Sequence, residues 1–339
     1  MNLDSEVNTA TRQRVTVFTP TINPIWMLER AYKSLLQQSV ECIQWIVISD
    51  ASEHDVSSFI ESTNSFIEIV YLRNEKRRGK NICYNFAVDL AKYDFFCILD
   101  DDDEITPNAL NDLLDVWFEI PANYRHFFWG VAGRSFTPTP SDKEKNPLTM
   151  IDDLNAKSAF KYTDGSYDYM KFELKQNDEK FSICLTAVLK SFPDDDIHFH
   201  IAPSVMWSRI SRNYIMRYTN RYVRIYHDSP NGIMKSKLDL KKLSERTLGL
   251  VIWLADDLNF NIKYFKRNTH HFLKLAANYV RYRTHASSQY HKQISPENYE
   301  LYVTKYRETT KIQSPLSRIL IFLAWPVGKI YFYLDRLFR

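Results

Sequence analysis

The sequence predicts an α/β fold, with a mostly parallel sheet covered by helices on both faces and a helical extension at its C-terminal end. Three observations support this prediction. Strand-like and helix-like segments alternate between residues 15 and 117, polar residues follow each strand-like segment, and apolar residues recur at helical spacing beyond Ser236. Such alternation is typical of right-handed β-α-β units, which build parallel sheets.

The strand-like segments are short runs of β-branched and aromatic residues, which favour strands. They lie at residues 15–18, 44–48, 67–72 and 94–99. Between them, apolar residues recur every three or four positions, as they do on one face of a helix. The predicted helices span residues 25–38, 55–62, 79–90 and 107–117, and the last begins with a proline, which is favoured in a first turn.

The pattern is weaker after residue 120. Residues 127–132 and 218–227 are predicted strands, residues 136–162 are a predicted long polar loop, and helical spacing returns over 237–258 and 263–283. We therefore expect four parts along the chain. They are a disordered lead-in at 1–14, an α/β domain at 15–230, a helical extension at 231–312 and an amphipathic tail at 313–339.

The composition excludes several classes of protein. The chain has 339 residues, of which 45% are hydrophobic and 25% charged, as in ordinary globular proteins. Only 7 glycines are present, which argues against repeated Gly-rich loops. The four cysteines form no CxxC pair and are predicted to be reduced thiols. The polar N-terminus up to Arg14 lacks the apolar core of a signal peptide, so we expect a cytoplasmic protein.

The net charge of +3 is unevenly distributed, because residues 261–339 contain 14 Lys/Arg and 4 Asp/Glu. This asymmetry indicates an anionic partner, either nucleic acid or anionic lipid. The tail favours lipid, since residues 319–327 are all apolar and cations lie on both sides. Pro326 and Lys329 interrupt the stretch, and a membrane-spanning helix needs about 20 apolar residues. We expect residues 316–339 to lie in the membrane interface. The alternative is a terminal helix packed on the domain, and no nucleic-acid recognition motif is present.

Polar side chains follow all four predicted strands at the points where they end. Thr21 and Asn23 follow the first strand, Asp50 and Ser52 the second, and Asn74 the third. The fourth strand ends directly in an acidic run. Because the carboxyl ends of parallel strands meet at one edge of a sheet, where ligands bind in open α/β folds, we expect a binding site there.

The acidic run consists of Asp100, Asp101, Asp102 and Asp103, with Glu104 next to it. One interpretation is a solvated loop that supplies negative charge to the N-terminus of the following helix. However, a row of carboxylates fixed at a strand end requires neutralisation by a cation. Hard oxygen ligands suit Mg²⁺ or Mn²⁺, which proteins usually share with substrate phosphates. A metal held here would stabilise a diphosphate as a leaving group.

Two further features fit a nucleotide. Asp50 could accept hydrogen bonds from a ribose or a base, although it could also cap the helix at 55–62. A basic stretch follows the third strand, and one or two of its cations could pair with phosphate. Arg73 lies nearest the strand end and Lys80 lies at the next helix start, so these two are favoured.

Together, four segments resemble family 2 glycosyltransferases of the GT-A fold, which is Rossmann-like. Residues 18–23 (FTPTIN) resemble the Pro-Thr-Tyr-Asn opening of the family, with Ile22 in place of tyrosine, and residues 46–52 (IVISDAS) resemble its Val-Asp-Asp-Gly-Ser element. Residues 79–85 (GKNICYN) resemble the Gly-Lys-x-x-Ala-x-Asn segment of a bacterial surface-polysaccharide subgroup, and residues 99–103 (LDDDD) resemble Leu-Asp-Ser-Asp-Asp with its DxD motif. Residues 188–193, 207–210 and 224–227 also resemble that subgroup, so the likeness ends near residue 228.

The resemblance implies roles for the matching residues. The nucleotide-sugar donor, with a UDP-sugar favoured, would be held by Pro20, Thr21, Asn23, Asp50, Arg73 or Lys80, and by Asp100 and Asp101. Mn²⁺ or Mg²⁺ would bind to Asp102, with Asp100 beside it. The acceptor would be a lipid-linked saccharide at the cytoplasmic face of the inner membrane, and the reaction would invert the anomeric centre.

One departure from the family concerns the general base, which takes the acceptor proton in an inverting transfer. The family has Glu or Asp before the Trp-containing helix, whereas residues 200–204 (HIAPS) contain no carboxylate. The nearest alternatives lie in the preceding segment: Asp194, Asp195, Asp196, His198 and His200. We favour His198 or Asp196, because histidine acts as a base near neutral pH without a shifted pKa. A structural role is the other interpretation of either histidine.

Two other functions compete with glycosyl transfer. A sugar nucleotidyltransferase also combines an α/β sheet with metal-binding aspartates, but that class usually opens with a Gly-rich basic loop, and residues 19–24 read TPTINP. A membrane-bound partner that binds nucleotide sugars and has lost its base is the second alternative. Binding of a donor without its turnover would identify that case.

Overall fold

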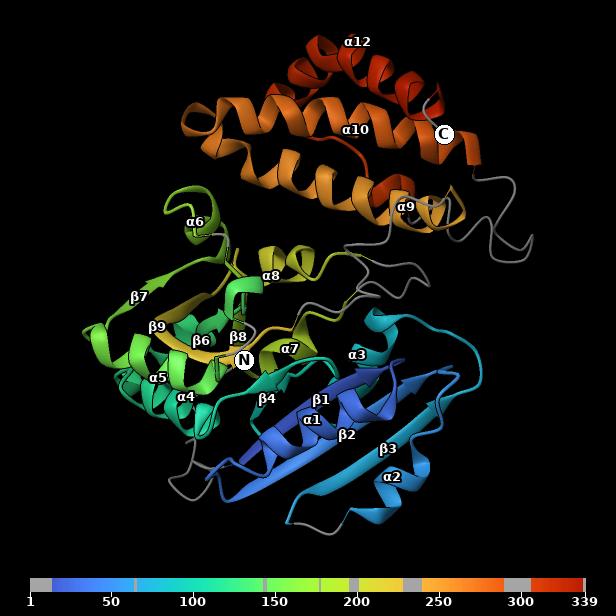
Figure 1. Cartoon of the computed structure of the whole chain (residues 1–339). Coiled ribbons are helices and arrows are strands. Elements are labelled where there is room, and N and C mark those ends of the chain that lie inside the picture. The colour runs from blue at the N-terminus through green and yellow to red at the C-terminus, as the bar shows by residue number, and fades with distance from the viewer. Residues whose placement is uncertain are drawn as a thin grey trace. The chain divides into compact units, whose positions relative to one another are not determined.

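The computed structural model describes residues 14–63, 66–142, 145–176, 178–194, 201–227, 240–289 and 306–337. These residues form two compact units (Figure 1). The first contains residues 14–167, 178–194 and 209–227 of the described chain, and the second contains residues 168–176, 201–208, 240–289 and 306–337. Two short segments of the predicted α/β domain, at 168–176 and 201–208, therefore belong to the second unit.

The first unit is built on a parallel sheet. Its first four strands in chain order are β1 (Arg14–Thr21), β2 (Cys42–Asp50), β3 (Glu68–Asn74) and β4 (Phe95–Ile98). They lie in the order β3-β2-β1-β4, and every neighbouring pair is parallel. All four predicted strands are confirmed, with ends shifted by no more than three residues. Because the strands are parallel, their carboxyl ends meet at one edge.

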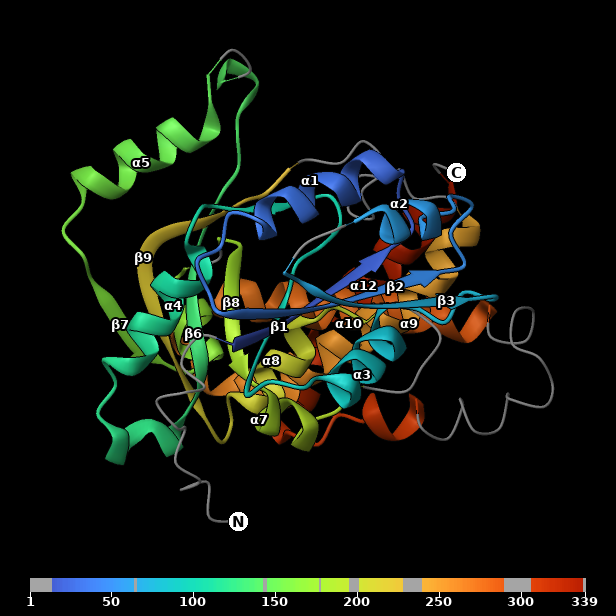
Figure 2. The ribbon, with the colours of Figure 1, turned by 90° about the horizontal axis from the view of Figure 1, so that it is seen from below.

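Helices cover both faces of this sheet, as predicted. They are α1 (Ile25–Leu35), α2 (Ser57–Ser62), α3 (Lys80–Leu90) and α4 (Ala109–Phe118). Figure 2 shows α1 and α2 on one face and α3 on the other. Alternate residues of each strand serve the two faces. Phe95 packs edge-on against Trp117 of α4, whereas its neighbour Phe96 packs against Tyr84 of α3.

Five further strands extend the sheet and make it mixed. They are β5 (Glu104–Ile105), β6 (Phe128–Phe136), β7 (Tyr162–Gly165), β8 (Lys180–Leu185) and β9 (Ile215–Ile225). β8 is antiparallel to both β4 and β6, β9 runs parallel to β6, and β5 and β7 are antiparallel to β9. At Gly130 of β6, an added Cβ would lie 2.2 Å from the carbonyl oxygen of Ile183, so only glycine allows β6 and β8 to approach this closely.

Six further helical elements lie between residues 122 and 210 of the described chain. They are η2 (Ala122–Phe127), η3 (Pro140–Asp142), α5 (Pro147–Lys157), α6 (Tyr167–Phe172), α7 (Thr186–Ser191) and α8 (Ser204–Ile210). The prediction of a long loop at 136–162 is wrong, because α5 lies within these residues. The side chain of Asn146 caps this helix by accepting from the Leu148 N–H, and Pro147 starts it. Ile151 is the one buried residue of α5, so its sequence lacks an apolar stripe.

The second unit is helical, as the spacing beyond Ser236 predicts. It contains α9 (Leu240–Asp256), a π-helical turn (Asp257–Asn261), a 3₁₀ segment (Ile262–Arg267), α10 (Thr269–Gln289) and α12 (Pro315–Leu337). Figure 1 shows α10 between α9 and α12. Gly328 lets α12 approach α10, since a Cβ there would lie 2.6 Å from the carbonyl oxygen of Ala277. Asp335 fixes the far end of α12 by pairing with Arg281 and His285 of α10.

Candidate active site

The ends of β1, β2 and β3 and the acidic run after β4 meet at one edge of the parallel sheet. Asn23 reaches the run directly, and its side-chain amide donates to Oδ1 of Asp101 over 2.9 Å. Ser52, which follows β2, donates to the carbonyl oxygen of Ile22 over 3.2 Å. Thr21 is buried at the last position of β1, and Pro20 precedes it in the same strand. The expected gathering of polar residues at this edge is therefore confirmed for these strands.

Asp50 holds the loop between β3 and α3. Its carboxylate accepts from the side-chain amide of Asn74 over 2.9 Å and from the backbone N–H groups of Arg78 and Gly79, each over 2.8 Å. Gly79 has a φ of 94°, a conformation that glycine adopts without strain. Asp50 does not cap α2, the alternative that the sequence left open, because Asp55 accepts from the Ser57 N–H instead.

The two favoured cations lie in different surroundings. Lys80 begins α3, and its ammonium forms a 2.5 Å ion pair with Oδ1 of Asp100. Arg73 lies in β3, and its guanidinium pairs with Asp55 over 3.5 Å, with both side chains exposed. The structure thus brings Lys80 to the acidic run, whereas the described contact of Arg73 lies beside α2.

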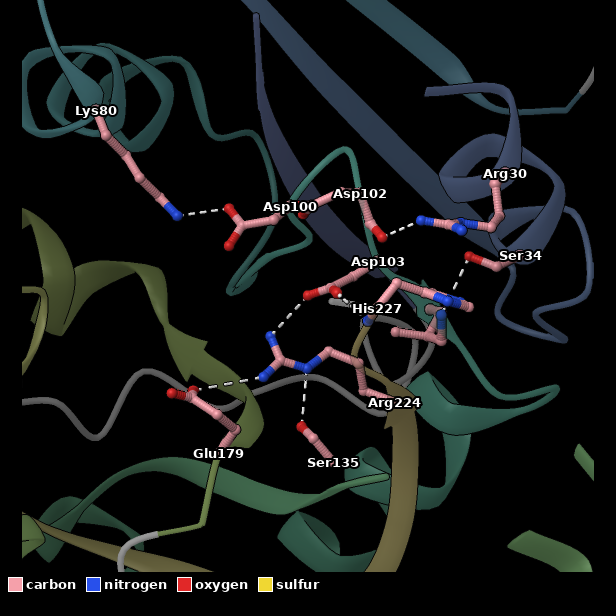
Figure 3. A network of polar contacts seen from close by, with 11 residues as sticks. Arg30, Ser34, Lys80, Asp100, Asp102, Asp103, Ser135, Glu179, Arg224 and His227 are labelled. Carbon is pink, nitrogen blue, oxygen red and sulfur yellow. Dashed lines mark hydrogen bonds and ion pairs between the residues drawn. The ribbon is translucent and has the colours of Figure 1, made fainter. Parts of the chain in front are cut away.

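The four aspartates of the run have four different environments (Figure 3). Asp100 pairs with Lys80, Asp101 accepts from Asn23, and Asp103 pairs with Arg224. The carboxylate of Asp102 makes no hydrogen bond or ion pair with another residue in the part of the chain that the structure describes. Only the backbone carbonyl of Asp102 is engaged, by the guanidinium of Arg30.

These environments shift the pKa values in opposite directions. Burial, together with repulsion by Asp100 and Asp101, raises the pKa of Asp102 to about 6. Burial also raises the pKa of Asp103, to about 7, although Arg224 acts in the opposite direction. Burial acts against ionisation of Asp100 too, but the Lys80 ammonium lowers the pKa of that carboxyl below its ordinary value. A bound cation would relieve the repulsion at Asp102.

Two residues of β9 and its end complete the site, and the sequence assigned them no role. Arg224 is buried, and its guanidinium pairs with Asp103 over 3.2 Å and donates from Nε to Oγ of Ser135 over 2.8 Å. The backbone N–H of His227 donates to Oδ1 of Asp103 over 3.1 Å, and its Nε2 lies 2.7 Å from Oε1 of Glu104. The motif at 224–227 was the available signal, but only the pairing of β9 with β5 places it beside the acidic run.

The proposed bases lie largely outside the described residues. Asp196 and His198, the favoured candidates, fall in the segment 195–200, which the structure does not describe. Asp194 is described, and its backbone is fixed against α3. Its N–H donates to Oδ1 of Asn85 over 2.9 Å, and its carbonyl accepts from Nδ2 of Asn85 over 3.0 Å.

The donor set can be tested for its fit to a divalent metal. Among the described residues, no three His, Cys, Asp or Glu side chains are grouped as a ready-made metal site. Mg²⁺ and Mn²⁺ sites at phosphates usually need only one or two carboxylates, because the substrate supplies other oxygens. Asp102 meets this requirement, since its carboxylate has no partner within the described part of the chain and its ionised form is repelled by negative neighbours.

Comparison with known proteins identifies the part of the chain that carries this site. Residues 16–172 match the model of the family described as glycosyl transferase family 2. This segment is a family 2 glycosyltransferase domain. Nearly all of the site described above lies within it, and Arg224 and His227 lie beyond its end.

Two curated bacterial glycosyltransferases are similar to parts of this chain. A GalNAc(5)-diNAcBac-PP-undecaprenol β-1,3-glucosyltransferase of Campylobacter jejuni is 31% identical over 117 residues, which are 34% of this chain and 37% of that protein. A putative colanic acid biosynthesis glycosyl transferase, WcaA of Escherichia coli K12, is 30% identical over 102 residues, which are 30% of this chain and 36% of that protein. The matches thus span little more than a third of either relative.

The chain also shares its fold with a solved structure. TarS 1–349 of S. aureus, in a crystal structure with UDP-GlcNAc, superposes with a TM-score of 0.52 at 14% identity, covering 95% of this chain and 92% of that one. At this identity the likeness concerns the fold alone. It confirms the predicted GT-A architecture with its C-terminal helices.

Proposed function

We propose that this chain is an inverting glycosyltransferase. It moves a sugar from a nucleotide-diphosphate sugar, with a UDP-sugar favoured, to a hydroxyl of a lipid-linked saccharide during bacterial surface-polysaccharide synthesis. One observation carries the proposal: in a family 2 domain, the Asp102 carboxylate, which has no partner among the described residues, lies where Asn23, Asp50 and Lys80 gather. The two bacterial relatives, by their names, act on an undecaprenol-linked saccharide and in colanic acid synthesis.

The geometry of the strand ends supports the proposed position of the donor. The nucleotide lies over β1 and β2, with Pro20, Thr21 and Asn23 on one side and Asp50 on the other. Lys80 is close enough to Asp100 to exchange its carboxylate partner for a phosphate, which an ammonium binds well. Arg73 binds the donor only if its ion pair with Asp55 is broken.

Asp102, with Asp100 beside it, would hold Mn²⁺ or Mg²⁺. When bound, such an ion supplies Lewis-acid stabilisation to the departing diphosphate. The chain itself orients the donor and fixes the acidic loop through Arg224 and Asp103. Inversion requires a base on the acceptor side, and Asp196 and His198 remain the proposed groups.

The test is nucleotide release from a panel of UDP-, GDP- and dTDP-sugars, with and without Mn²⁺ or Mg²⁺. We expect metal-dependent release from at least one donor. Asp102→Asn should lower the rate at least about 100-fold, because removing one element of transition-state charge stabilisation costs about that much. Asp115→Asn, on the exposed face of α4, is the control and should leave the rate unchanged.

Three other outcomes would each change the proposal. Donor binding without nucleotide release would indicate a membrane-bound partner that binds nucleotide sugars but has lost its catalytic base. Unchanged metal-dependent release in Asp102→Asn would remove Asp102 from the metal site. Release of pyrophosphate from a nucleoside triphosphate and a sugar phosphate would indicate a nucleotidyltransferase.

We further propose that α12 lies on the cytoplasmic face of the membrane. Its inward stripe, Leu320, Ala324, Gly328 and Phe332, packs within the helical unit. The opposite stripe is apolar and aromatic, with Phe322 78% exposed and Trp325 53% exposed. α12 is long and apolar enough to span a membrane by length and composition. An interfacial position fits better, because the inward stripe is already buried and Lys329 interrupts the helix.

Vesicle co-sedimentation tests the membrane proposal. The wild-type chain should bind phosphatidylglycerol vesicles. Phe322→Glu with Leu323→Glu should reduce binding at least about tenfold, because a charge in the interface opposes insertion of an apolar face. Phe66→Glu, at a residue 55% exposed in the first unit, is the matched control. Removal of residues 316–339 should also release the chain, and equal binding by all variants would overturn the proposal.

A further inference from the structure

A pocket of about 320 Å³ opens beside the acidic run, on the side of α1. One wall is formed by Trp26, Arg30 and Lys33 of α1 and by Gln37 just after this helix, and the other side is formed by Glu104 and Ile105 of β5 and Leu148 of α5. All of these elements belong to the first unit. The volume lies at the lower end of the range of about 300–1,000 Å³ that is typical of small-molecule sites. None of the donor-side residues assigned from the sequence lines it.

The pocket and Lys80 lie on opposite sides of the acidic run. In Figure 3, Asp100 points to Lys80 on one side of the run, and Asp102 lies next to Arg30 on the other. Arg30 lines the pocket and donates to the carbonyl oxygen of Asp102. The side chain of Arg30 would thus link a molecule in the pocket to Asp102, and the acidic run would lie between that molecule and Lys80.

The pocket is pre-formed by hydrogen bonds that join the end of α1 and the residues just after it to the segment that follows the acidic run. Oγ of Ser34 accepts from the Ile105 N–H over 3.2 Å. The side chain of Gln38 donates to the Thr106 carbonyl over 2.9 Å and accepts from the Leu110 N–H over 3.0 Å. These buried contacts fix the floor, so binding does not require it to be ordered.

The lining combines an aromatic face with polar groups. Trp26 is 56% exposed, and the guanidinium of Arg30 lies over its ring, 5.6 Å from the centroid. Nε of Arg30 is buried and has no hydrogen-bond partner among the described residues. Lys33 and Gln37 are exposed at the rim, and Glu104 lines the pocket while it contacts His227. An aromatic ring with several donors and acceptors around it suits a pyranose, which has apolar C–H faces and hydroxyl edges.

We propose that this pocket binds a pyranose unit of the acceptor saccharide, with Trp26 as its stacking surface. The inference rests on the proposed transferase function and assigns the acceptor a place within it. A nucleobase is the less favoured occupant. Asp50, which is the residue proposed to bind the nucleoside, lies at the end of β2 and does not line the pocket. A lipid chain is disfavoured by the charged lining.

Saturation-transfer NMR tests the inference with methyl glycosides of glucose, galactose, N-acetylglucosamine and N-acetylgalactosamine as probes. At least one glycoside should receive saturation from the wild-type chain. Trp26→Ala should weaken its binding about tenfold, which is the loss expected when one aromatic stacking contact is removed. Trp325→Ala, at an equally exposed tryptophan of α12, is the control and should bind like the wild type.

UDP binding by calorimetry supplies the second readout, because it separates the acceptor side from the donor side. Trp26→Ala should keep its affinity for UDP within about twofold. Loss of UDP affinity equal to the loss of glycoside affinity would assign the pocket to the nucleotide and overturn the inference. So would the absence of saturation transfer to every glycoside, or equal transfer in wild type and Trp26→Ala.

The inference and the transferase function fail separately. If no donor is turned over but a glycoside binds in a Trp26-dependent way, the pocket stands as a saccharide site and the transferase function falls. If a donor is turned over and no glycoside binds, the transferase function stands and the pocket loses its assignment.

Discussion

At the scale of single residues, the acidic run shows how neighbours give four identical side chains different properties. Asp100, Asp101 and Asp103 each have a partner, and those partners come from α3, from the chain after β1 and from β9. Asp102 has none among the described residues and receives the repulsion of its neighbours. An ionised carboxylate in that position destabilises the folded chain when no cation is bound to it.

Asp102→Asn should therefore stabilise the metal-free chain. The folded-state pKa of Asp102, about 6, lies above the unfolded value, so the wild type loses stability as the pH rises through this range. The variant lacks that loss. We expect it to gain about 1–2 kcal/mol near pH 7.5, after allowance for solvent screening at a half-buried group, and nothing near pH 4.

Urea unfolding at the two pH values measures this difference. Addition of Mn²⁺ should stabilise the wild type and leave Asp102→Asn unaffected, since a ligand stabilises only the state that binds it. A variant less stable than the wild type at both pH values would contradict the prediction.

Arg224→Gln should be strongly destabilising. Asp103 is fully buried, and its charge is compensated by the ion pair with Arg224 and by the N–H of His227. Breaking a buried pair by removing one partner costs about 3–5 kcal/mol. Arg134→Gln, in an exposed pair with Asp178 just before β8, should cost no more than about 1 kcal/mol. Chemical denaturation of both variants provides the measurement, and equal losses would contradict it.

The site was predictable in part. A run of aspartates after an apolar strand indicates a metal-binding edge, because parallel strands dictate where their ends meet. The partners of the run were less predictable, since Arg224 and His227 follow Asp103 by more than a hundred residues and reach it only through the pairing of β9 with β5. Asp50 appeared as a possible cap or ligand, and its hydrogen bonds to the loop at Arg78 and Gly79 depend on a turn that no spacing rule specifies.

At the scale of elements, burial explains which helices and strands the sequence predicts. β1, β2 and α1 bury most of their residues, so their apolar patterns are strong. α5 has one buried residue and β5 has two residues in total, so neither produces a periodic signal. Such elements are held by caps and by pairing with distant strands, which single-sequence patterns do not encode.

The contact between α10 and α12 gives a prediction at this scale. Asp335 accepts from Nε of Arg281 over 2.6 Å and lies 2.9 Å from Nε2 of His285. Burial opposes ionisation of Asp335, but these two partners lower its pKa below the ordinary value. The stabilisation is thus present above about pH 4, the unfolded pKa, and is lost as the pH falls through the lower folded pKa.

Asp335→Asn should lower the free energy of unfolding by about 1–3 kcal/mol near neutral pH, and the difference should shrink as the pH falls below about 4. Thermal unfolding followed from pH 3 to pH 7 measures it. Asp153→Asn, in an exposed pair with Lys157 on α5, is the control and should be neutral at every pH. A pH-independent loss in Asp335→Asn would show that the charge is not responsible.

At the scale of the whole molecule, charge and apolar surface coincide in the C-terminal part. Residues 261–339 carry the excess of basic residues, and the exposed apolar stripe of α12 lies within the same range. The four parts expected from composition remain a prediction. The two compact units divide the chain differently, because residues 168–176 and 201–208 join the helices through long-range contacts that composition does not reveal.

Membrane binding should therefore have a salt-sensitive part, from the basic residues, and a salt-resistant part, from the apolar stripe. Raising NaCl from about 0.05 M to about 0.5 M should weaken binding to phosphatidylglycerol vesicles at least about tenfold, because screening removes the attraction of exposed cations. A residual affinity from the apolar stripe should persist, and it should be absent in the Phe322→Glu, Leu323→Glu variant. Salt-independent binding would show that the basic residues do not face the lipid.

Gly130 has a consequence for how variants of this protein will be interpreted. β8 is paired to β4 on one side and to β6 on the other, and β6 in turn carries β9 with Arg224. A methyl group at position 130 would force β6 away from the Ile183 backbone. The displacement would pass along β9 to the guanidinium that steadies the acidic loop. Gly130→Ala would thus behave in an assay like an active-site lesion, although the substituted atom touches neither sugar nor nucleotide.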